Sequence, residues 1–173
     1  MDESMTRDGN AAEVKLLISF TVGTEEYGLE LLRVKEVIRM RHITWLPKAP
    51  ACMKGIINLR GDVIPIVDLR KKFGLVAQAQ TAMTRVIVVE VEGRPVGMVV
   101  DSASQVVRVP TDRFEPPPPM MGMAVQGFIT GVGKLDGKLI ITLDVDRILS
   151  TEEMSQISGS LEAAEKEPAL SRE

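Results

Sequence analysis

The chain has 173 residues, of which 45% are hydrophobic and 26% charged, the profile of a globular protein with one or two small cores. Its net charge of −3 and isoelectric point near 5.4 argue against a nucleic-acid backbone as a partner, which normally calls for a clustered basic face. Only 3% of the residues are aromatic, so the sequence predicts a core built mainly of aliphatic side chains and methionine.

The first residues carry no targeting signal. Residues 1–12 are polar, lack an apolar h-region and are expected to form a flexible tail. No apolar run approaches the roughly 20 residues that a membrane-spanning helix needs. Cys52 is the single cysteine, which excludes an internal disulfide and suits a reducing compartment. We therefore expect a cytoplasmic protein in which Cys52 is a small buried residue.

An internal repeat organises the chain. Residues 18–40 and 88–109 share one order of features: a strand, a glycine turn, a strand that contains a second glycine, and a Val-x-Arg ending. The offset between the two segments is 69 or 70 residues. The matched pairs are Gly23 with Gly93, Gly28 with Gly97, and Val37 with Val106.

The repeat continues further along the chain. Residues 55–73 resemble residues 127–149, which aligns Gly55 with Gly127 and Asp68 with Asp144. Each aspartate precedes a short segment whose first turn it can cap, so we expect few and short helices. Two copies with four or five short strands each predict a pair of small β-barrels. The predicted units are copy 1 at about residues 13–80, copy 2 at about 81–150, and a C-terminal helical turn with a polar tail at 151–173.

The stretch GIINLRGDVIPIVDL, residues 55–69, predicts a β-hairpin with a charged tip. Gly61 at the tip can adopt the positive φ that such a turn requires. Pro65 has no N–H for a ladder, so its strand lies at a sheet edge or turns this position away from a partner.

Three aspartates at strand ends, Asp68, Asp101 and Asp144, could suggest a metal site or an acid–base pair. Helix capping explains them better, because a repeat places equivalent residues in separate barrels. His42 is the only histidine, so a zinc site lacks ligands. The Gly131–Lys134 stretch lacks the rest of a phosphate-loop signature. We expect no enzyme activity, no metal and no cofactor.

Several separated motifs occur in an order that resembles the CheW-type coupling proteins of bacterial chemotaxis. The likeness covers residue 15 to about residue 150. The motifs are EEYGLELLRVKEV (residues 25–37), NLRG (58–61), VIPIVDLRKKFG (63–74) and VGMVVDSASQVV (96–107).

The resemblance implies an all-β fold with a few short helices, in which two pseudo-repeated SH3-like five-stranded β-barrels pack around a shared apolar seam. It also implies a non-catalytic adaptor that couples methyl-accepting chemoreceptors to the histidine kinase CheA. The receptor's helical-hairpin tip would lie in the groove between the barrels, and the regulatory domain of CheA would meet the end of one barrel. Such a protein is cytoplasmic and is recruited to membrane-associated receptor arrays.

Two alternatives to this function stay open. The chain could be a CheW-like adaptor of a non-flagellar kinase pathway, such as a pilus-type pathway. A more distant alternative is a nucleic-acid-binding β-barrel, although a basic aromatic face is missing.

Site residues follow from the same resemblance. Arg60 matches the arginine of the family's NLRG turn, which is implicated in receptor contact. Further positions at which the family binds receptor or kinase are Val34, Glu36, Gly55, Val86 and Val106. A structural role is the alternative at each of these positions: Val86 and Val106 could be core residues, and Gly55 could be a turn glycine. Roles in turns and caps are expected for Gly61, Asp68, Gly97 and Asp144.

Two features depart from the family pattern. Asp62 is charged where many relatives are apolar, and an ion pair with Arg60 within the turn is one possible role for it. The proline run Pro116–Pro119 aligns with a connection in copy 1, which favours a spacer over a ligand for an SH3 domain.

Overall fold

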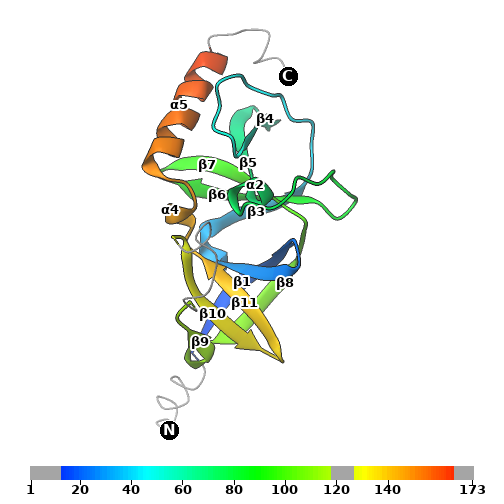
Figure 1. Ribbon diagram of the computed structural model, residues 1–173, viewed down its shortest axis with the longest axis vertical. Coiled ribbons are helices and arrows are strands. Elements are labelled where there is room, and N and C mark those ends of the chain that lie inside the picture. The colour runs from blue at the N-terminus through cyan, green and yellow to red at the C-terminus, as the bar shows by residue number, and fades with distance from the viewer. Residues whose placement is uncertain (1–12, 118–126, 166–173) are drawn as a thin grey trace.

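The computed structural model describes residues 13–117 and 127–165, and it consists mainly of β-strands arranged in two sheets (Figure 1). The predicted tails at residues 1–12 and 166–173 and the end of the proline run lie outside the described residues. Sheet A has the spatial order β8 (Ser102–Pro110), β1 (Val14–Val22), β2 (Glu25–Glu30), β11 (Lys138–Leu143), β10 (Ile129–Leu135) and β9 (Phe114–Glu115). Sheet B has the order β3 (Val34–Arg39), β6 (Arg85–Val91), β7 (Arg94–Val100), β5 (Asp62–Asp68) and β4 (Met53–Leu59).

The two sheets do not follow the two sequence copies. Strands β1 and β2 of copy 1 lie in sheet A beside strands of copy 2, and β6 and β7 of copy 2 lie in sheet B. The predicted boundary between residues 80 and 81 therefore does not separate the two structural units. The reason is that the chain crosses to the other sheet after β2 and again after β7. The repeat persists as an equivalence between sheets, because β8-β1-β2-β11-β10 matches β3-β6-β7-β5-β4.

Each sheet closes on itself. Strand β8 continues through the 3-10 helix η2 (Thr111–Arg113) into β9, which pairs with β10 on the far side of sheet A. In sheet B, the segment after β3 returns in the same way, and Thr44 exchanges backbone hydrogen bonds of 2.8 and 2.9 Å with Ile56 of β4. Closure removes most free strand edges. The predicted all-β fold with two small barrels is confirmed.

The register of two strand pairs corrects one part of the alignment between the two sequence copies. The β4–β5 pair has a register shift between Met53 and Gly55, and the β10–β11 pair has the same shift between Ile129 and Gly131. Gly55 is therefore equivalent to Gly131 and not to Gly127. Strand β5 is an interior strand, and its pairing with β7 covers only residues 66–68, so the missing N–H of Pro65 falls outside that ladder.

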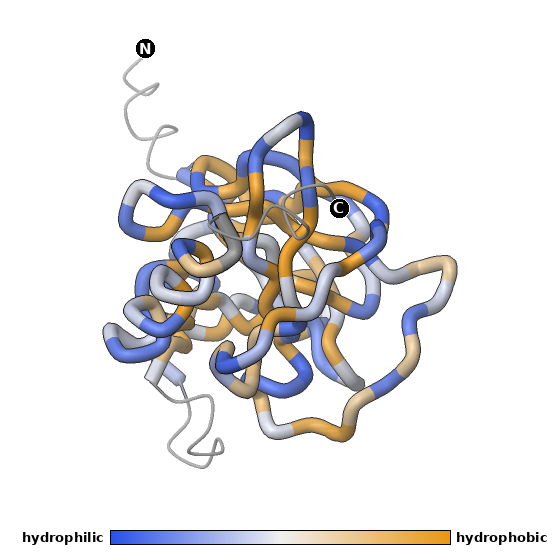
Figure 2. The backbone as a smooth tube through the Cα atoms, turned by 90° about the horizontal axis from the view of Figure 1, so that it is seen from above, coloured by the Kyte–Doolittle hydropathy of each residue, from blue (hydrophilic) through white to orange (hydrophobic). Residues whose placement is uncertain are grey.

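The largest apolar core lies between the barrels and takes side chains from both sheets, while a smaller cluster fills each barrel. Four of the few aromatic rings form a row in this shared core. Phe20 contacts Tyr27, Tyr27 contacts Phe73, and Phe73 contacts Phe128, with ring centroids 5.8, 4.9 and 5.6 Å apart. Figure 2 shows apolar segments running through the middle of the fold and polar residues at several of the outer turns. The predicted aliphatic core therefore has an aromatic centre.

Three α-helices occur in the described residues, and none is long and apolar enough to cross a bilayer. The short helices α2 (Leu69–Lys72) and α4 (Val145–Ile148) follow β5 and β11, as the sequence predicts. Helix α5 (Thr151–Glu165) is longer than the one or two turns expected. It lies beside sheet B (Figure 1) and buries Met154, Ile157 and Leu161. Burial of this apolar stripe explains a helix that local sequence signals alone do not predict.

The start of α5 is fixed by Glu153. The N–H of Glu153 donates to Ser150 Oγ at 3.0 Å, and the N–H of Ser150 donates to Glu153 Oε1 at 2.9 Å, which is the predicted capping box. Lys72 Nζ of α2 lies 2.6 Å from the same carboxylate. Burial raises the pKa of Glu153, but hydrogen bonds from Lys72 and Ser150 outweigh it, so the pKa lies below the ordinary value of a glutamate.

We expect this carboxylate to make stability depend on pH. Because its folded-state pKa is lowered, its contribution is present above its unfolded-state pKa and is lost as the pH falls through the lower folded-state pKa. Glu153→Gln replaces the carboxylate by an amide, which can still cap the helix but carries no charge. At pH 7 the variant should lose about 1 kcal/mol of unfolding free energy. Urea unfolding of both proteins at pH 7 and pH 3 should show the difference shrinking at the lower pH, and a constant difference would contradict this account.

Candidate functional site

The tip of the β4–β5 hairpin is a rigid two-residue turn. Leu59 pairs with Asp62, and the residues between them, Arg60 and Gly61, have φ of +53° and +91°. Positive φ at both central positions is the geometry that matches the twist of the flanking strands. The side-chain oxygen of Asn58 accepts a hydrogen bond of 2.9 Å from the N–H of Gly61. The turn therefore holds the Arg60 backbone in one conformation.

Arg60 does not pair with its neighbour Asp62. Its Nη2 atom forms an ion pair with Glu36 Oε2 of β3, and among the described residues this is its one side-chain partner. The Arg60 side chain is 68% exposed and that of Glu36 is 33% exposed. The structure thus brings together two predicted residues from distant parts of the chain, and it leaves most guanidinium donors facing solvent.

Strand β3 and its counterpart β8 carry partly exposed valines. Val34 opens the strand, is half-buried and packs against the shared core. Val37 is 39% exposed and pairs with Ile87 of that core. Its counterpart Val106 on β8 is 47% exposed and pairs with Ile18, in agreement with the predicted alignment of the two valines. Both edge strands therefore carry an exposed valine next to the shared core.

Two of the predicted contact residues are not at the surface. Val86 is 0% exposed and packs inside sheet B. Gly55 is buried, with φ of +150°, where a side chain would meet the Thr44 carbonyl oxygen and lie 2.8 Å from Ile43 Cγ2. Both positions fit the structural role that the sequence left open for them, and a role in partner contact stays a prediction. Gly97 has a similar packing role, because a Cβ there would lie 2.8 Å from Val86 Cγ1.

The three aspartates have separate roles. Asp68 and Asp144 accept hydrogen bonds of 3.0 and 2.9 Å from backbone N–H groups in the first turns of α2 and α4. Asp101 receives two hydrogen bonds from the guanidinium of Arg70. Within residues 13–117 and 127–165, no group of three His, Cys, Asp or Glu side chains is placed to hold a metal ion.

Cys52 is buried, as predicted. Burial raises the pKa of its thiol to about 11, so the thiol is protonated at neutral pH and is a poor nucleophile.

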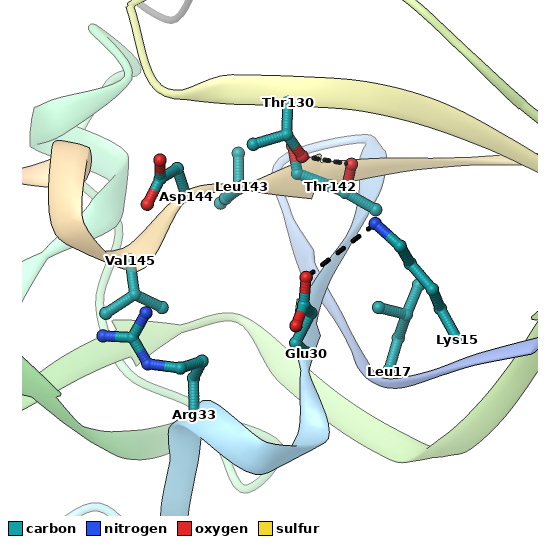
Figure 3. Close-up of a pocket in the computed structure, with 9 residues that line it drawn as sticks. All are labelled: Lys15, Leu17, Glu30, Arg33, Thr130, Thr142, Leu143, Asp144 and Val145. Carbon is teal, nitrogen blue, oxygen red and sulfur yellow. Dashed lines mark hydrogen bonds and ion pairs between the residues drawn. The ribbon is translucent and has the colours of Figure 1, made fainter. Parts of the chain in front are cut away.

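A pocket of about 200 Å³ lies beside η1 (Leu31–Arg33), near the start of α4 (Figure 3). Its polar groups pair with each other. Lys15 Nζ lies 3.8 Å from Glu30 Oε2, and the hydroxyl oxygens of Thr130 and Thr142 lie 2.7 Å apart. These four side chains thus have partners among the residues that line the pocket.

Comparison with known proteins agrees with this arrangement. A family model described as CheW-like domain matches residues 16–153. This chain belongs to the CheW-like family. It is 36% identical to the chemotaxis protein CheW of Klebsiella aerogenes over 140 residues, which are 81% of this chain and 84% of that protein. It is 32% identical to protein PilI of Pseudomonas aeruginosa over 115 residues, which are 66% of this chain and 65% of PilI.

A solved CheW-like structure has the same fold. The scaffolding protein TtCheW from Thermoanaerobacter tengcongensis superposes with a TM-score of 0.75 at 34% identity, covering 82% of this chain and 96% of that one. The chain is therefore a scaffold-type protein of chemotaxis signalling. The family resemblance predicted from separated motifs is confirmed.

Two ion pairs between the sequence copies were not predicted. Arg70 of α2 binds Asp101, and Arg33 of η1 binds Asp146 of α4. The sequence showed Asp101 at a strand end but gave no role to Asp146, and the arginine partners lie 31 and 113 residues away. No periodicity or motif in the sequence connects them.

Proposed function

We propose that this protein couples methyl-accepting chemoreceptors to a CheA-type histidine kinase. The observation that carries the proposal is the Arg60 turn, which holds a solvent-facing guanidinium against Glu36 on strand β3. A guanidinium in a fixed orientation can donate paired hydrogen bonds to a carboxylate or carbonyl group of a receptor.

Exposed valines on the two edge strands would suit a receptor helix. A helical-hairpin tip presents apolar side chains spaced by three or four residues, with polar side chains at the margins. Val37 and Val106 on the two edge strands supply apolar contacts, and Arg60 supplies a polar anchor. Val34 supports this surface from the start of β3.

The proposed contact with the kinase is argued from the duplicated barrel. The regulatory domain of CheA has the same double-barrel fold, and we propose that it meets the end of one barrel. A contact between unlike ends of similar domains is heterologous and can close into a ring if its rotation permits. In this proposal the protein works in the cytoplasm, joins membrane-associated receptor arrays and catalyses no reaction.

A binding experiment with both partners tests this function. The probes are the regulatory domain of a CheA-type kinase and a receptor cytoplasmic tip encoded in the same genome as this chain. Size-exclusion chromatography of the three proteins should show one complex that contains all of them. Binding of neither partner, or competition between the two, would refute the coupling role.

The similarity to PilI supports a second candidate, an adaptor of a pilus-type kinase pathway. The same chromatography with a pilus-type kinase domain distinguishes the two pathways. The preferred partner is the one that elutes with this chain at the lower protein concentration.

A further inference from the structure

Helices α2 and α4 place opposite charges at equivalent positions. In each helix an aspartate caps the first turn and accepts a hydrogen bond from the N–H two residues later. That later residue is Arg70 after Asp68, at 3.0 Å, and Asp146 after Asp144, at 2.9 Å. The two positions are therefore equivalent in the repeat, but one carries a cation and the other an anion.

Arg70 binds the chain where it crosses from sheet B to sheet A. Its Nε and Nη2 atoms donate to the two carboxylate oxygens of Asp101 at 3.0 and 2.9 Å. Asp101 also accepts a hydrogen bond of 2.8 Å from Gly23, and its N–H donates to the Thr21 carbonyl at 2.9 Å. We call the Arg70–Asp101 pair the first clamp. Its side chains are only 17% and 29% exposed.

Asp146 binds the other crossing, from sheet A to sheet B. Arg33 of η1 donates to its carboxylate from Nη1 and Nη2 at 3.0 and 2.8 Å, and Nη2 also donates to the Glu90 carbonyl at 3.2 Å. Glu90 is the repeat equivalent of Thr21, because 90 − 21 = 69. We call the Arg33–Asp146 pair the second clamp. Each clamp therefore joins a crossing segment, a short helix and a strand. These are the β7–β8 crossing, α2 and β1 in the first clamp, and the β2–β3 crossing, α4 and β6 in the second.

Each clamp joins copy 1 to copy 2, and the charges follow the copies. Copy 1 supplies both arginines, and copy 2 supplies both aspartates. Two longer ion pairs also cross between the copies, Lys35–Glu90 at 3.8 Å and Lys138–Glu26 at 4.0 Å. Among the described residues, only the two clamps cross between the copies with bidentate geometry, the geometry in which an arginine–carboxylate pair is strongest.

We propose that the two clamps specify which halves of this fold can pair. Because each barrel is completed by strands of both copies, two like halves could in principle build the same pair of barrels. Two copies of the first half would place arginine against arginine at both clamps, and two copies of the second half would place aspartate against aspartate. A half with two arginines accepts only a half with two aspartates, so that two like halves do not pair.

Four variants of the full chain test this inference. Two double variants reverse both charges of one half: Arg33→Asp with Arg70→Asp, and Asp101→Arg with Asp146→Arg. Each of them makes both clamps repulsive. Each should lower the melting temperature by about 5 to 10 °C. Reversing all four residues restores opposite charges and should recover most of this loss. As a matched control, Lys134→Glu reverses one partner of the exposed pair with Glu115 inside copy 2 and should change the melting temperature by less than about 2 °C.

Mixing the two half-reversed variants gives the decisive result. Within each variant the halves repel, but the first half of one variant has charges opposite to those of the second half of the other. The segment 73–84 between α2 and β6 is the only connection between the copies and is long enough to let halves exchange between chains. Unfolding both variants together in urea and refolding them should give a 1:1 heterodimer.

Native mass spectrometry measures the products, since the two variants differ in mass. We expect the heterodimer to exceed either homodimer by about tenfold, while the unaltered chain and the four-residue variant refold as monomers. The inference is overturned if heterodimers and homodimers form in statistical proportion. It is also overturned if the refolded mixture contains only monomers, or if the proteins aggregate without forming a heterodimer. So would failure of the four-residue reversal to recover stability.

Discussion

Gly55→Ala should destabilise the protein by about 3 to 5 kcal/mol, the largest stability effect that we expect from a single methyl group in this chain. The segment that closes sheet B passes directly over Gly55. A Cβ atom there would overlap the Thr44 carbonyl oxygen and lie 2.8 Å from Ile43 Cγ2. The Thr44 backbone cannot move away without losing its two hydrogen bonds to Ile56. The φ of +150° adds strain for any residue with a side chain.

Two other glycines provide matched controls, and urea unfolding measures all three variants. Gly61→Ala also carries a positive φ, but a Cβ there meets nothing within 4 Å, so the cost should be about 1 kcal/mol. Gly131→Ala, at the equivalent closure of sheet A, would approach the Glu115 carbonyl at 2.9 Å and should fall between the two. If Gly55→Ala cost no more than Gly61→Ala, the closure role of Gly55 would be wrong.

Arg60→Ala should weaken binding of the receptor tip by about 2 to 4 kcal/mol, which is roughly a 30- to 1,000-fold change in Kd. Truncation removes the hydrogen-bond donors and leaves the receptor group that they would bind without a partner. Arg60→Lys keeps the charge but loses the planar pair of donors, so it should recover only part of the affinity. The Kd for the CheA-type regulatory domain should stay within about twofold of the unaltered value. Isothermal titration with each partner separately measures both effects.

Controls separate recognition from folding. Asp62→Asn alters a charge in the same turn without touching the Arg60–Glu36 pair and should change receptor affinity by less than about threefold. Thermal unfolding of Arg60→Ala should stay close to that of the unaltered protein, because the Arg60 side chain is mostly exposed. An equal loss of affinity for receptor and kinase would refute the assignment of Arg60 to the receptor.

Much of the site could not be predicted because its partners lie far apart in the sequence. The pattern NLRG with a glycine turn predicted the hairpin tip correctly, since turn geometry depends on a few adjacent residues. The Arg60–Glu36 contact depends on how β3 and the β4–β5 turn come together in sheet B. The sequence left both contact and a structural role open for Val86 and Gly55, and the structure places both inside the fold. Burial depends on the surrounding strands, which local sequence does not describe.

The amino-acid sequence by itself determined the strands, the turns and the two aspartate caps, because each depends on residues only a few positions apart. It also showed the repeat, because the same pattern of residues occurs twice in the chain. The tertiary structure alone decided which strands share a barrel. The crossings after β2 and β7 send each copy into both sheets, and the two clamps hold those crossings in place. Helix α5 likewise owes its length to the core that it covers. These outcomes depend on long-range packing and on the pairing of distant charges, for which the sequence contains no periodic signal.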